Sequence, residues 1–179
     1  MPKLSDRVCQ RRPLVVLLGP TAVGKSRCGV QVAQHFGTEV LTADSRQVYR
    51  GMDIGTDKPT ADECQGIPHR LIDLADPDET FNTGWYRRAA LAEIDRLYTE
   101  SRLPFVVGGT GLYIRTLVRG LCPAPPADPE VRAALMQMCQ EQGRDRLHAE
   151  LIRVDPETAA RLHPNDEAKV IRALEVYRL

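Results

Sequence analysis

The 179-residue sequence contains no hydrophobic run near the roughly 20 residues that a membrane-spanning helix needs, so we expect no membrane protein. Its first twelve residues are polar and lack the apolar segment of a secretory signal peptide, which favours a cytoplasmic location. Internal repeats and low-complexity segments are absent as well. The composition, with 42% hydrophobic and 27% charged residues, is typical of a globular protein with a packed core.

The sequence also lacks paired cysteines and an excess of charge of either sign. Five cysteines are scattered without a Cys-x-x-Cys pair, at Cys9, Cys28, Cys64, Cys122 and Cys139. This odd, scattered set predicts reduced thiols and no zinc site. The 24 basic residues balance the 24 acidic ones, whereas nucleic-acid-binding proteins usually carry a basic excess. The equal numbers of basic and acidic residues are therefore weak evidence against a nucleic-acid-binding protein.

Short apolar segments alternate with amphipathic ones over the first two thirds of the chain. The expected strands are 14–18, 39–43, 70–74 and 104–107, and the expected helices run to about residue 35, over 83–100 and over 112–118. The continuous apolar run at 14–18 predicts a strand buried on both faces of a parallel sheet. In the first helix, Cys28, Val32 and Phe36 are expected to form the buried stripe. The alternation predicts an α/β fold with a parallel sheet flanked by helices.

A proline-rich segment, residues 122–129 (CPAPPADP), marks the expected domain boundary. It separates an α/β core, residues 1–122, from an all-helical segment, residues 123–179. In the helical segment, Asp128-Pro129 is expected to start one helix, which Gly143 ends. Asp155-Pro156 is expected to start a second, and Asn165 to cap a third.

One motif follows the first strand and precedes the first helix, where a phosphate loop must lie. It is GPTAVGKS, formed by Gly19, Pro20, Thr21, Ala22, Val23, Gly24, Lys25 and Ser26, and it fits the pattern G-x-x-x-x-G-K-[ST]. Glycines let successive backbone N–H groups point at a diphosphate, and the helix N-terminus adds to the attraction. Lys25 supplies a mobile positive charge and Ser26 can hold a magnesium ion. The motif predicts a P-loop NTPase-like sheet that binds a diphosphate.

Asp44 closes the second expected strand, at the sheet edge that faces the ligand in a parallel α/β fold. It can bind magnesium or act as a general base, or it can simply cap a turn. Nearby, Arg46 and Gln47 carry paired hydrogen-bonding groups suited to a base edge, although both residue types are also common on surfaces. His69 is more typical of a structural or surface histidine than of a catalytic one.

A second glycine-rich turn, residues 108–111, follows the strand at 104–107 and adds the hydroxyl of Thr110. Glycines there allow close approach of the backbone to a ligand. No aspartate ends this strand, so the Walker B carboxylate of ATP-hydrolysing motors is missing from its usual place.

Together these segments resemble the tRNA dimethylallyltransferase (tRNA isopentenyltransferase) family, most closely its bacterial members. The resemblance rests on six ordered motifs: GPTAVGKS (19–26), ADSRQVYRGMDIGTDKP (43–59), PHRLID (68–73), VGGTGLY (107–113), ADPEVRA (127–133) and HPNDEAKVIRALEVY (163–177). It implies transfer of a dimethylallyl group from its diphosphate to the exocyclic amine of the adenosine just 3′ of the tRNA anticodon. It also implies a cytoplasmic monomer that uses Mg²⁺ and binds the anticodon stem-loop of tRNA.

The resemblance further assigns roles to residues of this sequence. It implies catalytic roles for Thr21, Lys25 and Asp44, diphosphate binding by Gly19 to Ser26, and metal binding by Ser26. The implied tRNA contacts are Asp44, Ser45, Arg46, Gln47, Thr110, Arg132, Ala168, Lys169, Val170, Ile171 and Arg172. Residues 123–179 correspond to the family's insertion domain, and members continue past the ALEVY motif into further core that this sequence does not contain.

Three other functions remain open at this point. A small-molecule P-loop kinase would place ATP on the same loop, and an adenylate isopentenyltransferase would prenylate a free nucleotide. A catalytically inactive tRNA-binding fragment is the third. The helical segment and the 163–177 motif favour a tRNA acceptor, and the missing Walker B carboxylate disfavours ATP chemistry.

Overall fold

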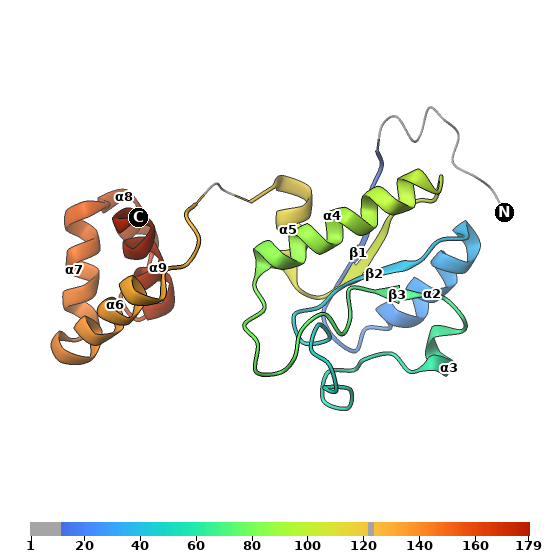
Figure 1. Cartoon of the computed structure of the whole chain (residues 1–179), viewed down its shortest axis with the longest axis horizontal. Coiled ribbons are helices and arrows are strands. Elements are labelled where there is room, and N and C mark those ends of the chain that lie inside the picture. The colour runs from blue at the N-terminus through green and yellow to red at the C-terminus, as the bar shows by residue number, and fades with distance from the viewer. Residues whose placement is uncertain (1–11, 122–123) are drawn as a thin grey trace. The chain divides into compact units, whose positions relative to one another are not determined.

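A computed structural model describes residues 12–121 and 124–179 (Figure 1). The chain divides into two compact units, with the division between Leu121 and Cys122. Cys28, Cys64 and Cys139 are free thiols, whereas Cys9, Cys122 and the N-terminal segment 1–11 lie outside the described residues. None of the helices in the described ranges is long and apolar enough to cross a membrane.

The first unit contains a parallel four-stranded sheet with the order β1-β4-β2-β3, which confirms the predicted fold class. Its strands are β1 (Val15–Leu18), β2 (Val40–Ala43), β3 (His69–Arg70) and β4 (Phe105–Gly108). The central strands β2 and β4 are buried at every position. Because side chains alternate between faces, Leu41 and Val106 point to one layer of helices while Val40 and Phe105 point to the other.

The prediction that the first strand is buried on both faces is wrong for the described part of the chain. β1 pairs with β4 alone and forms an edge of this sheet. Val15 is 39% exposed and Leu18 55% exposed. A continuous apolar run does not tell a central strand from an edge strand, since both are rich in the same residues.

Helices cover both faces of the sheet (Figure 1). α4 (Thr83–Thr99) and α5 (Gly111–Arg119) pack on one face, and α2 (Lys25–Phe36) packs on the other. The periodicity of α4 is confirmed, because Tyr86, Ala90, Ile94 and Leu97 are all buried. Asn82 caps this helix by accepting a hydrogen bond from the Trp85 N–H.

The stripe predicted for α2 is wrong at Cys28 and Phe36, which are exposed, whereas Val32 is half-buried and packs against the core as predicted. The fully buried residues of the helix are Gly29, Val30 and Ala33. A side chain added at Gly29 would come within 3.2 Å of a Val107 methyl group. The helix therefore approaches β4 most closely at its glycine, which hydrophobicity patterns do not register.

The connection between β2 and β3 differs from the expected loop and strand. It contains a short helix, α3 (Ala61–Cys64), which begins with a capping box between Thr60 and Glu63. β3 has only two residues instead of the five expected at 70–74. Leu71 ends the strand because its φ of +66° is incompatible with an extended backbone.

The second unit is helical, with α6 (Pro129–Gln142), α7 (Arg144–Val154), α8 (Pro156–Arg161) and α9 (Glu167–Arg178). Asp128 and Asp155 cap α6 and α8 as predicted. α7 was not predicted, and α9 is preceded by Asp166 rather than capped by Asn165. The core of the unit contains Leu135, Leu147, Leu151, Ala159 and Leu174.

Candidate active site

The phosphate-loop motif connects the end of β1 to the start of α2, as its spacing predicts. Gly24 precedes the helix with φ +81°, a conformation that favours glycine, and Ala22 also has a positive φ of 65°. The Lys25 ammonium group donates to the Pro20 carbonyl within the same loop. The first N–H groups of α2 have no carbonyl partners within the helix, so they point to the space in front of the loop.

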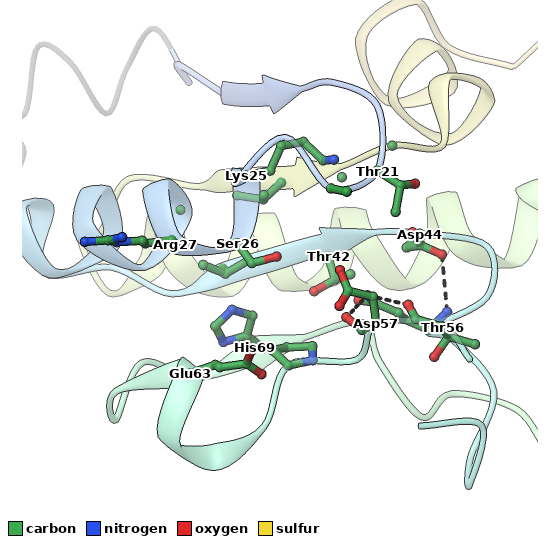
Figure 2. A pocket seen from close by; sticks show the side chains of 18 of the residues that line it. Thr21, Lys25, Ser26, Arg27, Thr42, Asp44, Thr56, Asp57, Glu63 and His69 are labelled. Atoms are coloured by element: carbon green, nitrogen blue, oxygen red, sulfur yellow. Dashed lines mark hydrogen bonds between the residues drawn. The ribbon is translucent and has the colours of Figure 1, made fainter. Parts of the chain in front are cut away.

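That space is part of a cavity of about 590 Å³ (Figure 2). Thr21, Lys25 and Ser26 of the phosphate loop line it, and Asp44 lines it from the end of β2, next to Thr21 in this view. The cavity is also lined by Ala22, Gly24, Arg27, Gly29, Val40, Thr42, Arg46, Gln47, Gly55, Thr56, Asp57, Pro59, Glu63, Gln65, His69, Val107, Gly108 and Gly109. It therefore combines the cationic phosphate loop with a carboxylate in one enclosure.

Asp44 is held in a defined orientation by the turn that follows β2. Its Oδ1 accepts hydrogen bonds from the backbone N–H groups of Arg46, at 2.8 Å, and Gln47, at 3.3 Å. The next residue, Ser45, donates its N–H to the Thr110 hydroxyl at 2.9 Å. Asp44 thus caps a turn, as one of the sequence interpretations predicted, and it also lines the cavity.

The loops after β2 and β4 are joined tightly behind Asp44. Thr110 donates its N–H to the Ala43 carbonyl at 3.0 Å, in addition to accepting from Ser45. A side chain at Gly108 would come within 2.1 Å of the Ala43 carbonyl oxygen, so only glycine allows this approach. The glycine-rich turn at 108–111 therefore positions the Asp44 turn through the backbone.

A stacked aromatic pair supports β2 just before Asp44. The rings of Tyr86 and Tyr113 are parallel within 10°, with centroids 4.0 Å apart. The Tyr86 hydroxyl donates to the Thr42 carbonyl at 3.1 Å. Burial, together with the nearby Tyr49 and Asp44 side chains, raises the pKa of Tyr113 to about 12. The phenol stays neutral, so it forms an uncharged wall behind the carboxylate.

A well-anchored loop forms another wall of the cavity. Gln47 donates its side-chain amide to the carbonyls of Thr56, at 3.1 Å, and Asp57, at 2.8 Å. Lys58 is buried and donates to the Tyr49 carbonyl at 2.9 Å and to Asp73 at 2.7 Å. Burial alone would lower the pKa of Lys58, but its bonds to Asp53 and Asp73 outweigh burial and raise that pKa.

The family model for IPP transferases matches residues 47–179. The chain belongs to the IPP transferase family. This match covers most of the chain and includes Gln47, Thr56 and the whole helical unit.

Named relatives of this family agree with the match. The chain is 50% identical over 165 residues to tRNA dimethylallyltransferase 2 of Geotalea uraniireducens, covering 92% of this chain and 53% of the relative. It is 47% identical over 174 residues to tRNA dimethylallyltransferase of Geobacter sulfurreducens, covering 97% and 56% respectively. The chain thus spans about half the length of the curated relatives it matches.

Solved structures show the same fold. A tRNA isopentenylpyrophosphate transferase from Bacillus halodurans is 44% identical, with a TM-score of 0.62 and coverage of 94% of this chain and 56% of that one. A eukaryotic dimethylallyltransferase described as acting on tRNA is 31% identical, with a TM-score of 0.78 and coverage of 92% and 41%. The α/β sheet with flanking helices is therefore a fold that this chain shares with IPP transferases.

The structure brings part of the predicted site together in the first unit. The predicted residues that line the cavity are Thr21, Ala22, Gly24, Lys25, Ser26, Asp44, Arg46 and Gln47. Gly19, Pro20 and Val23 belong to the same loop outside the lining. Gln47, interpreted as a reader of a base edge, instead commits its amide N–H groups to the loop at Thr56 and Asp57.

The predicted tRNA contacts of the second unit differ among themselves. Val170 and Ile171 are 1% and 6% exposed in the core of that unit, so their side chains offer no surface to an RNA. Arg172 pairs with the buried Glu175, and Lys169 pairs with Asp166. Ala168 and Lys169 are exposed, and Arg132 shares Glu175 with Arg172.

Several residues of the cavity were missed by sequence reasoning. Thr56 and Asp57 lie in a segment that was read as an ordinary loop, and Arg27 and Glu63 lie on α2 and α3. His69 was interpreted as structural, and its Nδ1 lies 3.0 Å from the Ile67 carbonyl, yet the residue also lines the cavity. The motif at 43–59 was the one signal that could have indicated Thr56 and Asp57.

Proposed function

We propose that the protein transfers a dimethylallyl group from dimethylallyl diphosphate to the exocyclic amine of the adenosine 3′ of the anticodon in tRNA, releasing diphosphate. The observation that carries this proposal is that the phosphate loop and Asp44 line the same cavity. The loop suits an anionic leaving group, and the carboxylate suits a group that must lose a proton. The relatives named as tRNA dimethylallyltransferases support this choice of reaction.

The phosphate loop is the proposed site of the diphosphate. The first N–H groups of α2 and the Lys25 ammonium group offer positive charge to its oxygens, and the Thr21 and Ser26 hydroxyl groups offer hydrogen bonds. These groups become more favourable as the bond to carbon breaks, since negative charge then accumulates on the departing diphosphate. Lys25 and Thr21 therefore act on the leaving group.

The residues present fit a magnesium ion only together with the diphosphate. In the described ranges no three His, Cys, Asp or Glu side chains converge to hold a metal. The Ser26 hydroxyl lines the cavity at the start of α2, where it could supply one oxygen ligand while phosphate oxygens supply others. When bound, the ion would neutralise charge on the leaving group.

Asp44 is the proposed acceptor of the proton. As the adenine amine attacks, a bond forms between its nitrogen and the carbon that carried the diphosphate, and the carbon–oxygen bond breaks. The amine then gives a proton to the carboxylate. Oδ1 of Asp44 is held by Arg46 and Gln47, while Oδ2 has no partner among the residues that the structure describes. An aromatic amine is a weak nucleophile, so a fixed carboxylate helps mainly through orientation.

The partner and setting extend the same proposal. We infer that the anticodon stem-loop of tRNA is the acceptor, that residues 123–179 form an insertion domain that grips it, and that the protein works as a cytoplasmic monomer. The exposed Ala168 and Lys169 are the members of the predicted 168–172 contact set with the most accessible side chains. Arg132 and Arg172 are half-exposed beside Glu175 and could reach phosphates from there.

The test uses radiolabelled dimethylallyl diphosphate, magnesium and either unmodified tRNA or AMP. We expect label in tRNA and none in AMP. Label in AMP alone would replace the proposal with an adenylate isopentenyltransferase. If neither tRNA nor AMP is labelled but tRNA still binds, the chain would instead be a catalytically inactive tRNA-binding fragment.

The decisive variant is Asp44→Asn, because asparagine keeps the Oδ1 acceptor of the turn and removes the carboxylate base. We expect turnover to fall at least about 100-fold, the usual contribution of a general base, with little change in tRNA binding. Asp78→Asn is the matched control, since Asp78 is exposed and outside the cavity lining. Unchanged turnover in Asp44→Asn would remove Asp44 from this role.

A further inference from the structure

Ile54 is an exception among the hydrophobic residues of the first unit. Its exposed fraction is 101%, so the side chain contacts nothing, whereas other exposed large hydrophobic residues retain part of their burial. It directly precedes Gly55, Thr56 and Asp57, which line the cavity. An apolar side chain of this size therefore stands in solvent at the rim of the candidate active site.

The exposure of Ile54 is not the result of a loosely held loop. Lys58 ties the segment to Asp53, at 2.5 Å, and to Asp73, and the Thr56 hydroxyl donates to the Met52 carbonyl. The anchor bonds fall on both sides of Ile54. The loop thus presents this side chain at a fixed place, at low entropic cost to any contact it makes.

The loop is also connected to the carboxylate. Gln47 donates its backbone N–H to Asp44 and its side-chain amide to the carbonyls of Thr56 and Asp57. Thr56, Asp57 and Asp44 line the same cavity (Figure 2). Gln47 therefore fixes the loop that carries Ile54 relative to Asp44.

A stacked base cannot bring its amine into this cavity. Enzymes that modify a base take it out of the stack, which leaves a gap between the two neighbouring bases. Proteins that open a stack often insert an isoleucine, leucine, methionine or phenylalanine as a wedge in such a gap. A rigid, fully exposed isoleucine at the rim of the receiving cavity has the chemistry and the place that this task requires.

We propose that Ile54 is a wedge that enters the base stack of the RNA substrate at the position left by the adenosine. This inference rests on the proposed function and assigns a positioning role to a residue outside the cavity lining. Met52, which is 37% exposed in the same loop, is the natural neighbour for the flanking base. Ile54 acts by stabilising the unstacked RNA and touches no reacting atom.

The test measures base unstacking directly, without dimethylallyl diphosphate. An RNA hairpin carries the fluorescent analogue 2-aminopurine at the target adenosine, and its fluorescence rises when the base leaves the stack. We expect saturating wild-type protein to raise the fluorescence and Ile54→Ala to lower the ratio of unstacked to stacked RNA about tenfold, since burial of an aliphatic side chain contributes on that scale. Ile54→Leu, which keeps the apolar volume, should retain most of the signal.

Two controls separate a wedge from a general defect. Val118→Ala removes apolar volume at a 63% exposed position on α5 and should leave the fluorescence unchanged. In a short single-stranded RNA whose target base is unstacked beforehand, labelled dimethylallyl transfer should be equal in wild type and Ile54→Ala. On the hairpin the variant's transfer should fall in parallel with the fluorescence.

The outcomes distinguish the wedge from the proposed function. If the wild type prenylates the hairpin and Ile54→Ala matches it in both readouts, the reaction stands and the wedge is refuted. Equal losses by Ile54→Ala on hairpin and unstacked RNA would also refute it, and would indicate a general defect in substrate binding or turnover instead. If the wild type neither prenylates the RNA nor unstacks its base, both proposals fall.

Discussion

Glu39 offers a quantitative test of how the first unit is held together. This carboxylate immediately precedes β2 and its side chain is only 5% exposed. It accepts from Arg70 at 2.8 Å, from Arg96 at 2.7 Å and from Arg102 at 2.6 Å. One side chain therefore joins the start of the central strand to β3, to α4 and to the segment that leads into β4.

The contribution of Glu39 to the free energy of unfolding follows from the shift of its pKa. Burial by itself would raise this pKa, but the hydrogen bonds from Arg70, Arg102 and Arg96 outweigh burial and lower it from the usual 4.5 to about 2. A difference of that size corresponds to about 3.4 kcal/mol, at 1.36 kcal/mol for each pH unit. Because the arginines are 28 to 47% exposed, solvent screens the pairs, and we expect about 2 kcal/mol of stabilisation.

The sign of the pH dependence is fixed by the direction of the shift. Since the pKa of Glu39 is lower in the folded than in the unfolded chain, the stabilisation is fully present above about pH 4.5 and is lost as the pH falls towards 2. Glu39→Gln removes the charge at every pH. The difference in free energy of unfolding between wild type and Glu39→Gln should therefore be about 2 kcal/mol at pH 7 and shrink steadily below pH 4.5.

The assay is urea denaturation followed by tryptophan fluorescence at pH 7, 5 and 3. Trp85 is the single tryptophan and lies on α4, so the signal reports the first unit alone. Asp76→Asn is the control in the same unit, because Asp76 is 57% exposed and its ion pair with Arg50, at 3.0 Å, is open to solvent. A difference for Glu39→Gln below about 0.5 kcal/mol at pH 7, or one equally large at pH 3, would refute the reasoning, because solvated surface pairs behave in that way.

Two further substitutions test packing in each unit. Gly108→Ala should destabilise the first unit by about 3 kcal/mol or prevent its folding, because the new methyl group would lie 2.1 Å from the Ala43 carbonyl oxygen; near-normal urea denaturation would contradict this. Glu175→Gln should cost the helical unit about 3 kcal/mol, since it leaves Arg132 and Arg172 without their fully buried partner. Circular dichroism at 222 nm would show that loss as an earlier melt, and an unchanged melting profile would be inconsistent with it.

The elements best predicted from the sequence are those whose structure depends on local pattern. α4 repeats an apolar residue every three to four positions and is buried at the predicted places. β4 is a short apolar run between a proline and a pair of glycines, and it lies in the centre of the sheet as expected. Asp128-Pro129 and Asp155-Pro156 start helices because cap and first residue act within a few bonds.

The elements that were mispredicted depend on contacts between distant segments. The edge position of β1 is decided by which strands pair with it, and its own residues do not record that. The buried face of α2 depends on the close approach of Gly29 to the Val107 side chain, and a pattern of hydrophobic residues does not record such a contact. Thr56 and Asp57 form a wall of the cavity because Gln47 and Lys58 anchor their loop. The two Gln47 bonds join residues 9 and 10 positions apart in the sequence, and the bond from Lys58 to Asp73 joins residues still further apart.

The geometry of Asp44 allows one residue to cap a turn and to serve as the proposed proton acceptor. Its Oδ1 faces two backbone N–H groups, so the carboxylate cannot rotate without losing both bonds. That constraint fixes the direction of Oδ2, which has no partner in the described chain. Replacing Asp44 by alanine would remove the base and the turn together, whereas asparagine separates them, so comparing the two variants measures how much of the rate depends on orientation.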